Sequence, residues 1–303
     1  MWVSPHNHSS SSYNSRNFIP RKHRVLERTQ AVLLAISGII EGKLFLLDRK
    51  SKFTIGRAKS CDICLIHTDI SQRHARLAIT ETGEVVITDL ATTHGTYVDG
   101  IAISHHTLAD GAIIQIGPTD ALKFTYINHL EKSFHLNQYR KTIYDDLTGA
   151  FNRRYFLMAL RQELAYAIHY RESISLILVD IDRFKQINDS QGHVVGDGVL
   201  RRMVAVIQGN LRKEDILARY GGEEFGIILR GKNVEQAHVI ANRVRHSVER
   251  TAFNNVDKSF YITISAGVAS YDQGYPSNGV LEMLTQADKQ LYRAKAMGGN
   301  HTF

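Results

Sequence analysis

Residues 173–180 read SISLILVD, a short apolar segment that ends in a carboxylate and is typical of a buried strand. The chain on either side of it alternates between helical and strand patterns. Apolar residues recur at helical spacing in 153–170, 197–210, 233–250 and 279–297, whereas 215–219, 224–229 and 261–268 are short strand-like segments. From 173 to 268 the order is therefore β-α-β-β-α-β, which predicts a ferredoxin-like α+β fold, an antiparallel sheet with helices on one face.

The first half of the chain has a different pattern. Short segments rich in Val, Ile, Leu, Phe and Tyr are separated by turn residues, which predicts an all-β sandwich. The expected strands lie at 32–36, 43–48, 52–56, 63–66, 75–80, 84–90, 96–98, 113–116 and 121–127. A weakly amphipathic stretch then predicts a connector helix. The expected domains are a disordered Ser-rich basic tail (1–30), the sandwich (31–128), the connector (129–145) and the α+β domain (146–303).

Charge and hydropathy narrow the functional classes. The 303 residues carry a formal net charge of +7, and residues 1–28 alone hold five basic side chains against one acidic one. A basic tail can contact nucleic acid, but no nucleic-acid-binding motif accompanies it, so a solvated tail is favoured. The longest apolar run, 31–40, is half of the ~20 residues that cross a bilayer, and no signal peptide is visible. A cytoplasmic protein with no membrane span is expected.

Carboxylates come together at one edge of the predicted sheet. Asp180 ends the first strand, and the hairpin tip reads Gly221-Gly222-Glu223-Glu224-Phe225. Such oxygen ligands suit Mg²⁺, which is usually held by one or two carboxylates together with substrate phosphates. Paired glycines let a phosphate approach the backbone, and exposed amides over 181–185 could cradle further phosphates. Taken alone, the hairpin is equally consistent with a glycine turn and solvated glutamates.

The surrounding motifs favour the first interpretation. They are Asp146-Leu-Thr-Gly149, Asn152-Arg-Arg154, Val179-Asp-Ile-Asp182, Phe184-Lys-Gln-Ile-Asn-Asp189, Gly192-His193, Gly196-Asp197, Arg219-Tyr-Gly-Gly-Glu-Glu-Phe225, Thr263-Ile-Ser-Ala-Gly267 and Ala287-Asp288 with Tyr292-Arg-Ala-Lys295. With these motifs, residues 145–303 resemble the GGDEF family of diguanylate cyclases. The resemblance implies that two GTP molecules, one in each domain of a homodimer, condense into cyclic di-GMP and two pyrophosphates, with Mg²⁺ or Mn²⁺ as cofactor.

The resemblance also implies roles for individual residues. Asp180, the main-chain carbonyl of Ile181 and Glu223 are expected to hold the metal. Glu223, with Glu224 nearby, is the candidate catalytic group for deprotonating the ribose 3′-hydroxyl. The implied substrate contacts are Lys185 and Lys295 on the phosphates and Asn188 and Asp197 on guanine. Because an aspartate accepts from guanine N1–H and N2–H₂, which adenine cannot supply, GTP is expected over ATP.

One position departs from the family pattern. After Lys295 the family commonly has Ala-x-Gly-Arg-Asn, whereas this chain has Ala-Met-Gly-Gly-Asn300. Gly299 thus replaces an arginine expected to contact the terminal phosphates. Loss of one charge-assisted contact costs about 1.5–3 kcal/mol of binding free energy. Weaker GTP affinity, rather than loss of activity, is therefore expected.

A second nucleotide site is implied by Arg212-Lys-Glu-Asp215, which matches the family's R-x-x-D inhibitory motif, with Arg243 aligned to its second arginine. Arginine pairs with guanine O6 and N7, and aspartate accepts from the N1/N2 edge, so this set suits a guanine dinucleotide. Inhibition by the product, cyclic di-GMP, is expected there.

Motifs of another family run through the N-terminal sandwich. They are Phe53-Thr-Ile-Gly-Arg57, Cys61-Asp-Ile-Cys64-Leu65, Ile70-Ser-Gln-Arg-His-Ala75, Asp89-Leu90, His94-Gly-Thr-Tyr-Val-Asp-Gly100 and Leu108-Ala-Asp-Gly-Ala-Ile-Ile-Gln-Ile-Gly117. With them, residues 31–127 resemble a forkhead-associated (FHA) domain, which reads phosphothreonine. The implied phosphopeptide contacts are Arg57, Ser71, Arg73 and His94, where His94 replaces the family's usual asparagine. His74 is expected to hold its loop by hydrogen bonding rather than to contact the ligand.

Two cysteines, Cys61 and Cys64, form a lone C-x-x-C within these motifs. Zinc would normally need four ligands, and a redox pair needs the start of a helix, whereas this pair lies in a strand-like stretch. A core-filling role is therefore favoured over a chemical one.

These observations lead to one functional expectation and one alternative. The chain is expected to be a diguanylate cyclase regulated by a phosphothreonine protein, or by its own tail phosphorylated at Ser9–Ser12 or Thr29, which sets dimer geometry through the connector helix. The alternative is a non-catalytic adaptor, whose FHA domain recruits a phosphoprotein and whose C-terminal domain only senses cyclic di-GMP.

Overall fold

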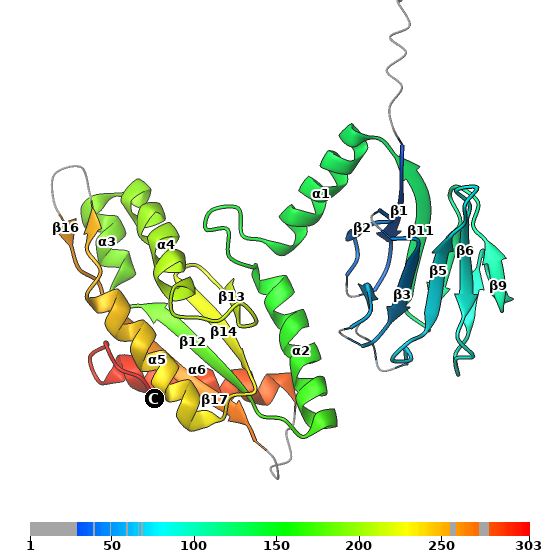
Figure 1. Cartoon of the computed structure of the whole chain (residues 1–303). Helices are drawn as coiled ribbons and strands as arrows, with labels where there is room; N and C mark the ends of the chain where they lie inside the picture. The colour runs from blue at the N-terminus through cyan, green and yellow to red at the C-terminus, as the bar shows by residue number, and fades with distance from the viewer. Residues whose placement is uncertain are drawn as a thin grey trace, which may run out of the picture.

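The computed structural model describes residues 29–303 except 39, 49, 59, 66, 68, 255–258 and 273–278. Figure 1 shows an N-terminal β-sandwich and a C-terminal α+β domain, with helix α1 between them. Most of the expected tail, including Ser9–Ser12, lies outside the described residues. No helix within the described ranges combines the length and the apolar character needed to cross a bilayer.

Two sheets form the N-terminal domain, as the sequence predicts. The first has the order β2 (Leu44–Leu46), β1 (Gln30–Ala35), β11 (Asp120–Ile127), β10 (Ile113–Ile116), β7 (Thr96–Val98) and β8 (Ile101–Ile103). The second has the order β4 (Ile63–Cys64), β3 (Lys52–Gly56), β5 (Ala75–Ile79), β6 (Val85–Asp89) and β9 (His105–Thr107). Between the sheets lies a core that includes Leu33, Ile55 and Phe124, none of which is exposed.

The strand prediction for this domain missed β8 and β9. Most of their side chains face solvent, including all three of β9. Without a buried face, these strands lack the apolar alternation by which a strand is recognised in a sequence. Both are edge strands, for which short length and polar character discourage pairing with other chains.

The connector helix α1 (His129–Ile143) matches its predicted position. Asn128 and Glu131 form a capping box at its N-terminus. None of its residues is buried, and Leu130 and Phe134 are 72% and 59% exposed. Beyond its end, the rings of Tyr144 and Phe151 stack with centroids 4.9 Å apart, and Phe151 stacks in turn on Tyr155.

A single four-stranded antiparallel sheet organises the C-terminal domain. Its order is β13 (Ile216–Arg219), β14 (Glu224–Arg230), β12 (Ile174–Ile181) and β17 (Ile264–Tyr271). This is the strand order of the ferredoxin-like fold predicted from the sequence. Strand β12 lies inside the sheet, and all eight of its residues are buried.

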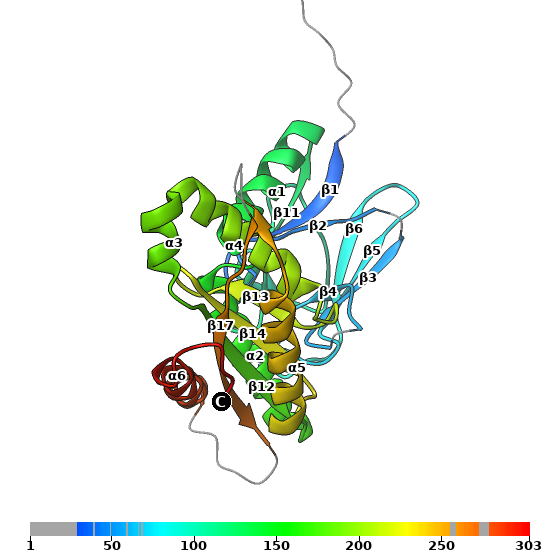
Figure 2. The same ribbon diagram turned by 90° about the vertical axis from the view of Figure 1, so that its left-hand side faces the viewer.

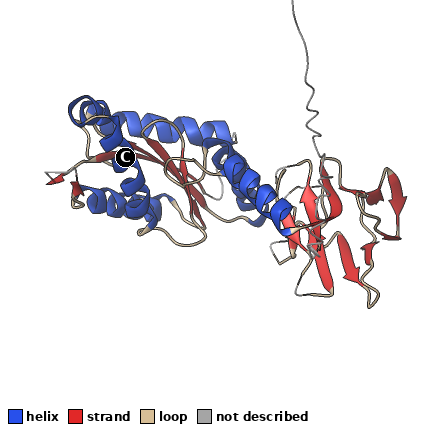
Figure 3. Ribbon diagram, turned by 90° about the horizontal axis from the view of Figure 1, so that it is seen from above, coloured by secondary structure: helices blue, strands red, loops and turns tan. Residues whose placement is uncertain are grey.

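The two long helices of the predicted β-α-β-β-α-β unit lie on one face of the sheet, as expected, and two helices outside that unit cover the other face. Helices α4 (His193–Gln208) and α5 (Val234–Glu249) cover one face through a shared apolar cluster. Helices α2 (Arg153–Tyr170) and α6 (Val280–Ala296) cover the other through a second cluster, and Figure 3 shows helices on both sides of this sheet. Because β12 is apolar at every position but its serine and terminal carboxylate, it requires cover on both faces.

Three short elements were not predicted. Helix α3 (Phe184–Gln191) follows β12 where the sequence suggested a loop of exposed amides. A small hairpin of β15 (Phe253–Asn254) and β16 (Ser259–Phe260) precedes β17. Only Phe184 of α3 is buried, so its sequence has too few apolar residues to reveal a helical period.

Phe156 on α2 can be used to test how much packing against the sheet face covered by α2 and α6 contributes to the free energy of unfolding. It is fully buried in the cluster beneath α2 and α6. Phe156→Ala should lower the free energy of unfolding by about 3–5 kcal/mol, since a large buried ring leaves a cavity. Phe134→Ala, on exposed α1, is the matched control and should change it by less than about 0.5 kcal/mol. Urea denaturation of both variants checks this, and equal losses would contradict the assigned packing.

Candidate active site

The buried carboxylate of Asp180 lies at the end of β12, with the residue only 5% exposed. Lys295 of α6 places its Nζ 2.7 Å from Asp180 Oδ2. Burial raises the pKa of Asp180 to about 6; Lys295 opposes this rise, and the charges of Glu223 and Glu224 add to it. Although Lys295 lowers the pKa of Asp180, burial and the two other carboxylates together raise it by more.

Strand pairing gathers the other carboxylates around Asp180. Asp180 pairs directly with Glu224 across β12 and β14, and side chains opposite each other on antiparallel strands have Cβ atoms about 4.5–5.5 Å apart. Glu223 precedes β14 in the hairpin between β13 and β14. Its charge contributes to the raised pKa of Asp180. The three acidic residues singled out in the sequence therefore share one end of the sheet.

The donor set here fits a divalent cation. Among the described residues, no three His, Cys, Asp or Glu side chains form a ready-made cluster for a metal ion. The predicted ligand set is different, since it consists of two carboxylates, those of Asp180 and Glu223, and the main-chain carbonyl of Ile181. All are hard oxygen donors of the kind that Mg²⁺ and Mn²⁺ prefer.

An open cavity of about 420 Å³ adjoins these carboxylates. Its lining includes four of the predicted catalytic and substrate residues, Lys185, Asn188, Asp197 and Glu223. Helices α3 and α4 carry the first three, and the glycine hairpin carries the fourth. Lys295 is not part of this lining and instead contacts Asp180. His193 and Arg219 also line the cavity, although the sequence suggested no role for either.

Close packing of α3 on α4 fixes the two residues predicted to bind guanine. A Cβ atom at Gly196 would lie 1.9 Å from Oδ1 of Asn188, so a side chain at 196 would displace the Asn188 amide from its position. Asp197 follows directly. Both side chains are half-buried, which leaves their polar atoms open to the cavity that they line.

Arg219 is a positioning residue that the sequence reasoning missed. Its Nε and Nη2 donate to the main-chain oxygen of Gly222 at 2.9 and 2.8 Å. Its Nη1 lies 3.2 Å from both carboxylate oxygens of Asp145. Asp145 also accepts from the amide and hydroxyl of Thr148. The tip of the glycine hairpin is thus tied to the segment that follows α1. The sequence signal for this role was the presence of an arginine two positions before the Gly221-Gly222 pair.

The expectation of free amides over 181–185 needs correction at Asp182. Its amide donates to the carbonyl of Thr263. Its carboxylate accepts from the hydroxyls of Thr263 and Ser265 and from the amide of Asn300, each at 2.7 Å. Asp182 therefore anchors the segment after α6 to the sheet.

Gly299 lies against this anchor. Its φ is +83°, and a Cβ atom there would lie 2.8 Å from Cγ of Asp182. A side chain at 299 would clash with the anchor and strain the backbone. The arginine that the family carries at this position does not fit this conformation.

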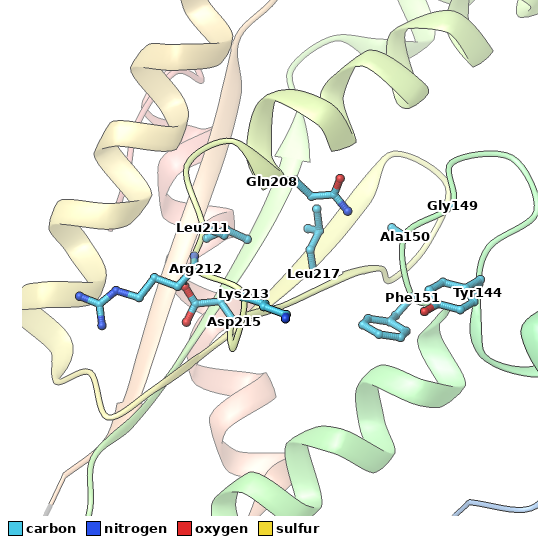
Figure 4. Close-up of a pocket in the computed structure, with 10 residues that line it drawn as sticks. All are labelled: Tyr144, Gly149, Ala150, Phe151, Gln208, Leu211, Arg212, Lys213, Asp215 and Leu217. Atoms are coloured by element: carbon cyan, nitrogen blue, oxygen red, sulfur yellow. The ribbon is translucent and has the colours of Figure 1, made fainter. Parts of the chain in front are cut away.

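The R-x-x-D segment borders a separate cavity of about 350 Å³, shown in Figure 4. The Arg212 amide donates to Asp215 Oδ2 at 2.8 Å, which closes the turn, and burial raises the pKa of Asp215. The Arg212 side chain is directed away from the aromatic wall of Tyr144 and Phe151. Arg243 is outside the lining, but its Nη2 donates to the carbonyl of Asn210 on the same loop.

In the N-terminal domain, hydrogen bonds join the loops that carry the predicted phosphopeptide contacts. The Arg57 amide donates to the carbonyl of Ser71 at 2.9 Å. His74 is fully buried, and its Nδ1 accepts a hydrogen bond from the Ser71 amide. The proton of the ring is therefore on Nε2, which donates to the carbonyl of Gly95, the residue after His94. His74 thus holds the loops, as predicted. Arg73 and His94 are exposed.

The two cysteines belong to this arrangement. Neither forms a disulfide; Cys61 is buried and Cys64 half-buried. Cys61 Sγ donates to the carbonyl of Gln72 and Cys64 Sγ to that of Arg57. They fill the end of the core and brace the loops that carry Arg57 and Ser71.

Comparison with known proteins agrees with this geometry. The family model described as "Diguanylate cyclase, GGDEF domain" matches residues 142–301, and an FHA-domain model matches residues 53–117. The probable diguanylate cyclase DgcT of Escherichia coli K12 is 38% identical over 159 residues, which cover 52% of this chain and 34% of DgcT. The chain thus spans about a third of the length of that relative.

Solved structures give the same result. The coiled coil and GGDEF domain of DgcB from Caulobacter crescentus, in complex with c-di-GMP, matches with a TM-score of 0.53 and 29% identity over 57% of this chain and 91% of that one. Diguanylate cyclase SiaD of Pseudomonas aeruginosa, in complex with its activator SiaC, matches with a TM-score of 0.52 and 32% identity over 57% and 66%. Since the GGDEF model covers more than half of its residues, the chain belongs to the GGDEF-domain family and carries an FHA domain in its N-terminal half.

Proposed function

We propose that the C-terminal domain is a diguanylate cyclase, which joins two GTP molecules into cyclic di-GMP and releases two pyrophosphates. The observation that carries the proposal is the cavity lined by Lys185, Asn188, Asp197 and Glu223 beside buried Asp180. Base-reading, phosphate-binding and proton-accepting groups lie there within the reach of one nucleotide. The named relatives and structures support the same activity.

Recognition of the base falls to α3 and α4. Asp197 offers carboxylate oxygens to guanine N1–H and N2–H₂, and the Asn188 amide can both donate and accept. Adenine has no donor at N1, so its binding would leave a desolvated carboxylate unpaired, and GTP is selected. Lys185 lines the same cavity and Lys295 contacts Asp180, and both are proposed to bind the phosphates.

The reaction requires two such domains facing each other. The 3′-oxygen of one GTP attacks the α-phosphorus of the other, a new P–O bond forms, and the bond to the departing pyrophosphate breaks. Glu223, with Glu224 beside it, accepts the proton of the attacking hydroxyl. The same exchange in the opposite direction closes the ring, which is why a homodimer is proposed.

Asp180, Glu223 and the Ile181 carbonyl would hold the metal ion in this proposal. When bound there, Mg²⁺ or Mn²⁺ supplies positive charge to the reacting α-phosphate and the leaving pyrophosphate. Lys295, 2.7 Å from Asp180, is then available to move onto a phosphate oxygen.

The first test is product formation. Wild-type protein with GTP and Mg²⁺ should yield cyclic di-GMP on chromatography, and EDTA should abolish it. Asp180→Asn and Glu223→Gln should each reduce the rate at least a hundredfold, because each removes a metal ligand and Glu223 also the proton acceptor. Glu235→Gln, an exposed glutamate on α5, is the control and should retain full activity. Wild-type protein that binds cyclic di-GMP but forms none would instead favour the adaptor alternative.

Product inhibition is proposed at the R-x-x-D segment. Arg212 is exposed enough to bind a dinucleotide, with side-chain exposure of 61%, and Asp215 lies beside it in the cavity of Figure 4. Arg243 is held against the same loop through Asn210.

Arg212→Ala should raise the cyclic di-GMP concentration that halves the initial rate by about tenfold or more, since a bidentate contact to guanine contributes about 1–3 kcal/mol. Initial rates with added product measure this. The uninhibited rate should remain that of wild type, because Arg212 lies outside the catalytic cavity. Unchanged inhibition would remove the assignment.

The FHA domain is proposed to bind a phosphothreonine peptide through Arg57, Ser71, Arg73 and His94 and thereby to regulate the cyclase. The braced loops support this, since Arg57 and Ser71 are hydrogen-bonded neighbours whose guanidinium and hydroxyl can donate to one phosphate. His94 can replace one, but not both, of the backbone contacts that an asparagine makes.

Arg57→Ala should weaken binding of a phosphothreonine peptide library at least tenfold, because it removes a charge-assisted contact to phosphate. Fluorescence anisotropy measures this, with the unphosphorylated library as the reference. Arg76→Ala, an exposed arginine on β5, is the control. Equal binding by Arg57→Ala and wild type would refute the assigned phosphate contact.

A further inference from the structure

The segment after α6 excludes a cation where the triphosphate is expected to end. Gly298, Gly299 and Asn300 have successive φ values of +102°, +83° and +56°. Asp182 holds this turn through the Asn300 amide and lies where a side chain of residue 299 would begin. If the domain binds GTP, a cation that replaces this arginine would have to come from another part of the chain.

A cavity of about 490 Å³ lies beside this turn. Gly298 and Asp182 line it together with Arg183 and four residues of α3 that include Gln186 and Ser190. Lys185 and Asn188, on the same short helix, line the proposed nucleotide cavity instead. The two cavities therefore border α3 on different faces, and the N-terminus of α3 lies between them.

Arg183 lies at the N-terminus of α3, and its side chain is accessible to a ligand. It is the residue before α3 and has φ +57° and ψ +29°. Its side chain is exposed, and among the described residues its guanidinium has no hydrogen-bond or ion-pair partner. In Figures 1 and 2, α3 and the C-terminal end of α6 lie on the same side of the domain.

The other arginines near this end of the sheet are already engaged. Arg219 is bound by Asp145 and by the Gly222 carbonyl. Arg245 donates to Oδ1 of Asn300 at 2.7 Å and is only 13% exposed in its side chain. Asp182, the acidic neighbour of Arg183, has its carboxylate satisfied by three hydrogen bonds. In contrast to Arg219 and Arg245, Arg183 is therefore available to an incoming anion.

We propose that Arg183 binds the terminal phosphates of GTP, replacing the arginine that Gly299 excludes. The proposal rests on the proposed GTP-dependent function. A triphosphate whose guanine lies between Asn188 and Asp197 passes over the start of α3, where free amides favour anions. It then reaches the corner that Arg183 and Gly298 share. A guanidinium there can donate two parallel hydrogen bonds to phosphate oxygens.

The decisive variant is Arg183→Gly. Glycine adopts a left-handed backbone without strain, so the change removes the cation and leaves the turn intact. Arg171→Gly is a matched control, because Arg171 is also an exposed arginine with φ +55°, at the opposite end of β12. Arg183→Lys keeps the charge without the planar fork.

Binding of 3′-deoxy-GTP, which lacks the attacking hydroxyl, and of GMP should be measured by calorimetry with Mg²⁺ present. Arg183→Gly should bind 3′-deoxy-GTP about tenfold more weakly than wild type and GMP equally well. Arg171→Gly should match wild type, and Arg183→Lys should fall between. Unchanged 3′-deoxy-GTP affinity, or an equal loss for GMP, would overturn the proposal.

The same experiment separates this proposal from the cyclase proposal. Wild-type protein that binds 3′-deoxy-GTP but makes no cyclic di-GMP from GTP would refute the catalytic function, while the comparison of Arg183 variants would still decide the phosphate contact. Wild-type protein that binds neither nucleotide would refute both.

Discussion

The C-terminal domain depends on one constraint, a central strand that is buried on both faces and ends in a carboxylate. All eight residues of β12 are buried, and Asp180 is among them. A buried carboxylate requires compensation, and Lys295 supplies it from α6, which packs beneath the same strand. The pairing of β12 with β14 then brings the glycine hairpin and its glutamates to the same end. The fold and the position of the acidic site therefore have a common origin.

Helices and strands that bury one face, or that are buried on all sides, have a regular pattern of apolar residues. These elements could be predicted in the right order from that pattern alone. Helix α2 and strand β12 lie where apolar spacing placed them. Prediction failed for α3, β8 and β9, which bury too little to leave a pattern. The second helical layer was also missed. Although α2 and α6 were predicted as helices, the face they cover is set by tertiary packing, which a sequence pattern does not contain.

Motifs identified the residues that line the proposed nucleotide cavity but not the contacts that hold them. Arg219 meets Asp145 across 74 positions, and Asp182 meets Asn300 across 118. Contacts between residues so far apart in the sequence leave no recognisable pattern in any short stretch of it. The absence of an arginine at 299 was visible in the sequence, whereas its reason was not, because the reason is a backbone dihedral and the carboxylate of a distant residue.

The ion pair between Arg219 and Asp145 couples the end of α1 to the glycine hairpin. Asp145 lies two residues beyond the end of α1, and its partner arginine grips the carbonyl of Gly222. If α1 rotates, Asp145 can move the glycine hairpin with it through Arg219. If the hairpin does not follow, the ion pair between Arg219 and Asp145 must break. The connection runs through the backbone of Gly222, which directly precedes Glu223. It therefore links the end of α1 to the acidic end of the sheet without involving the buried core.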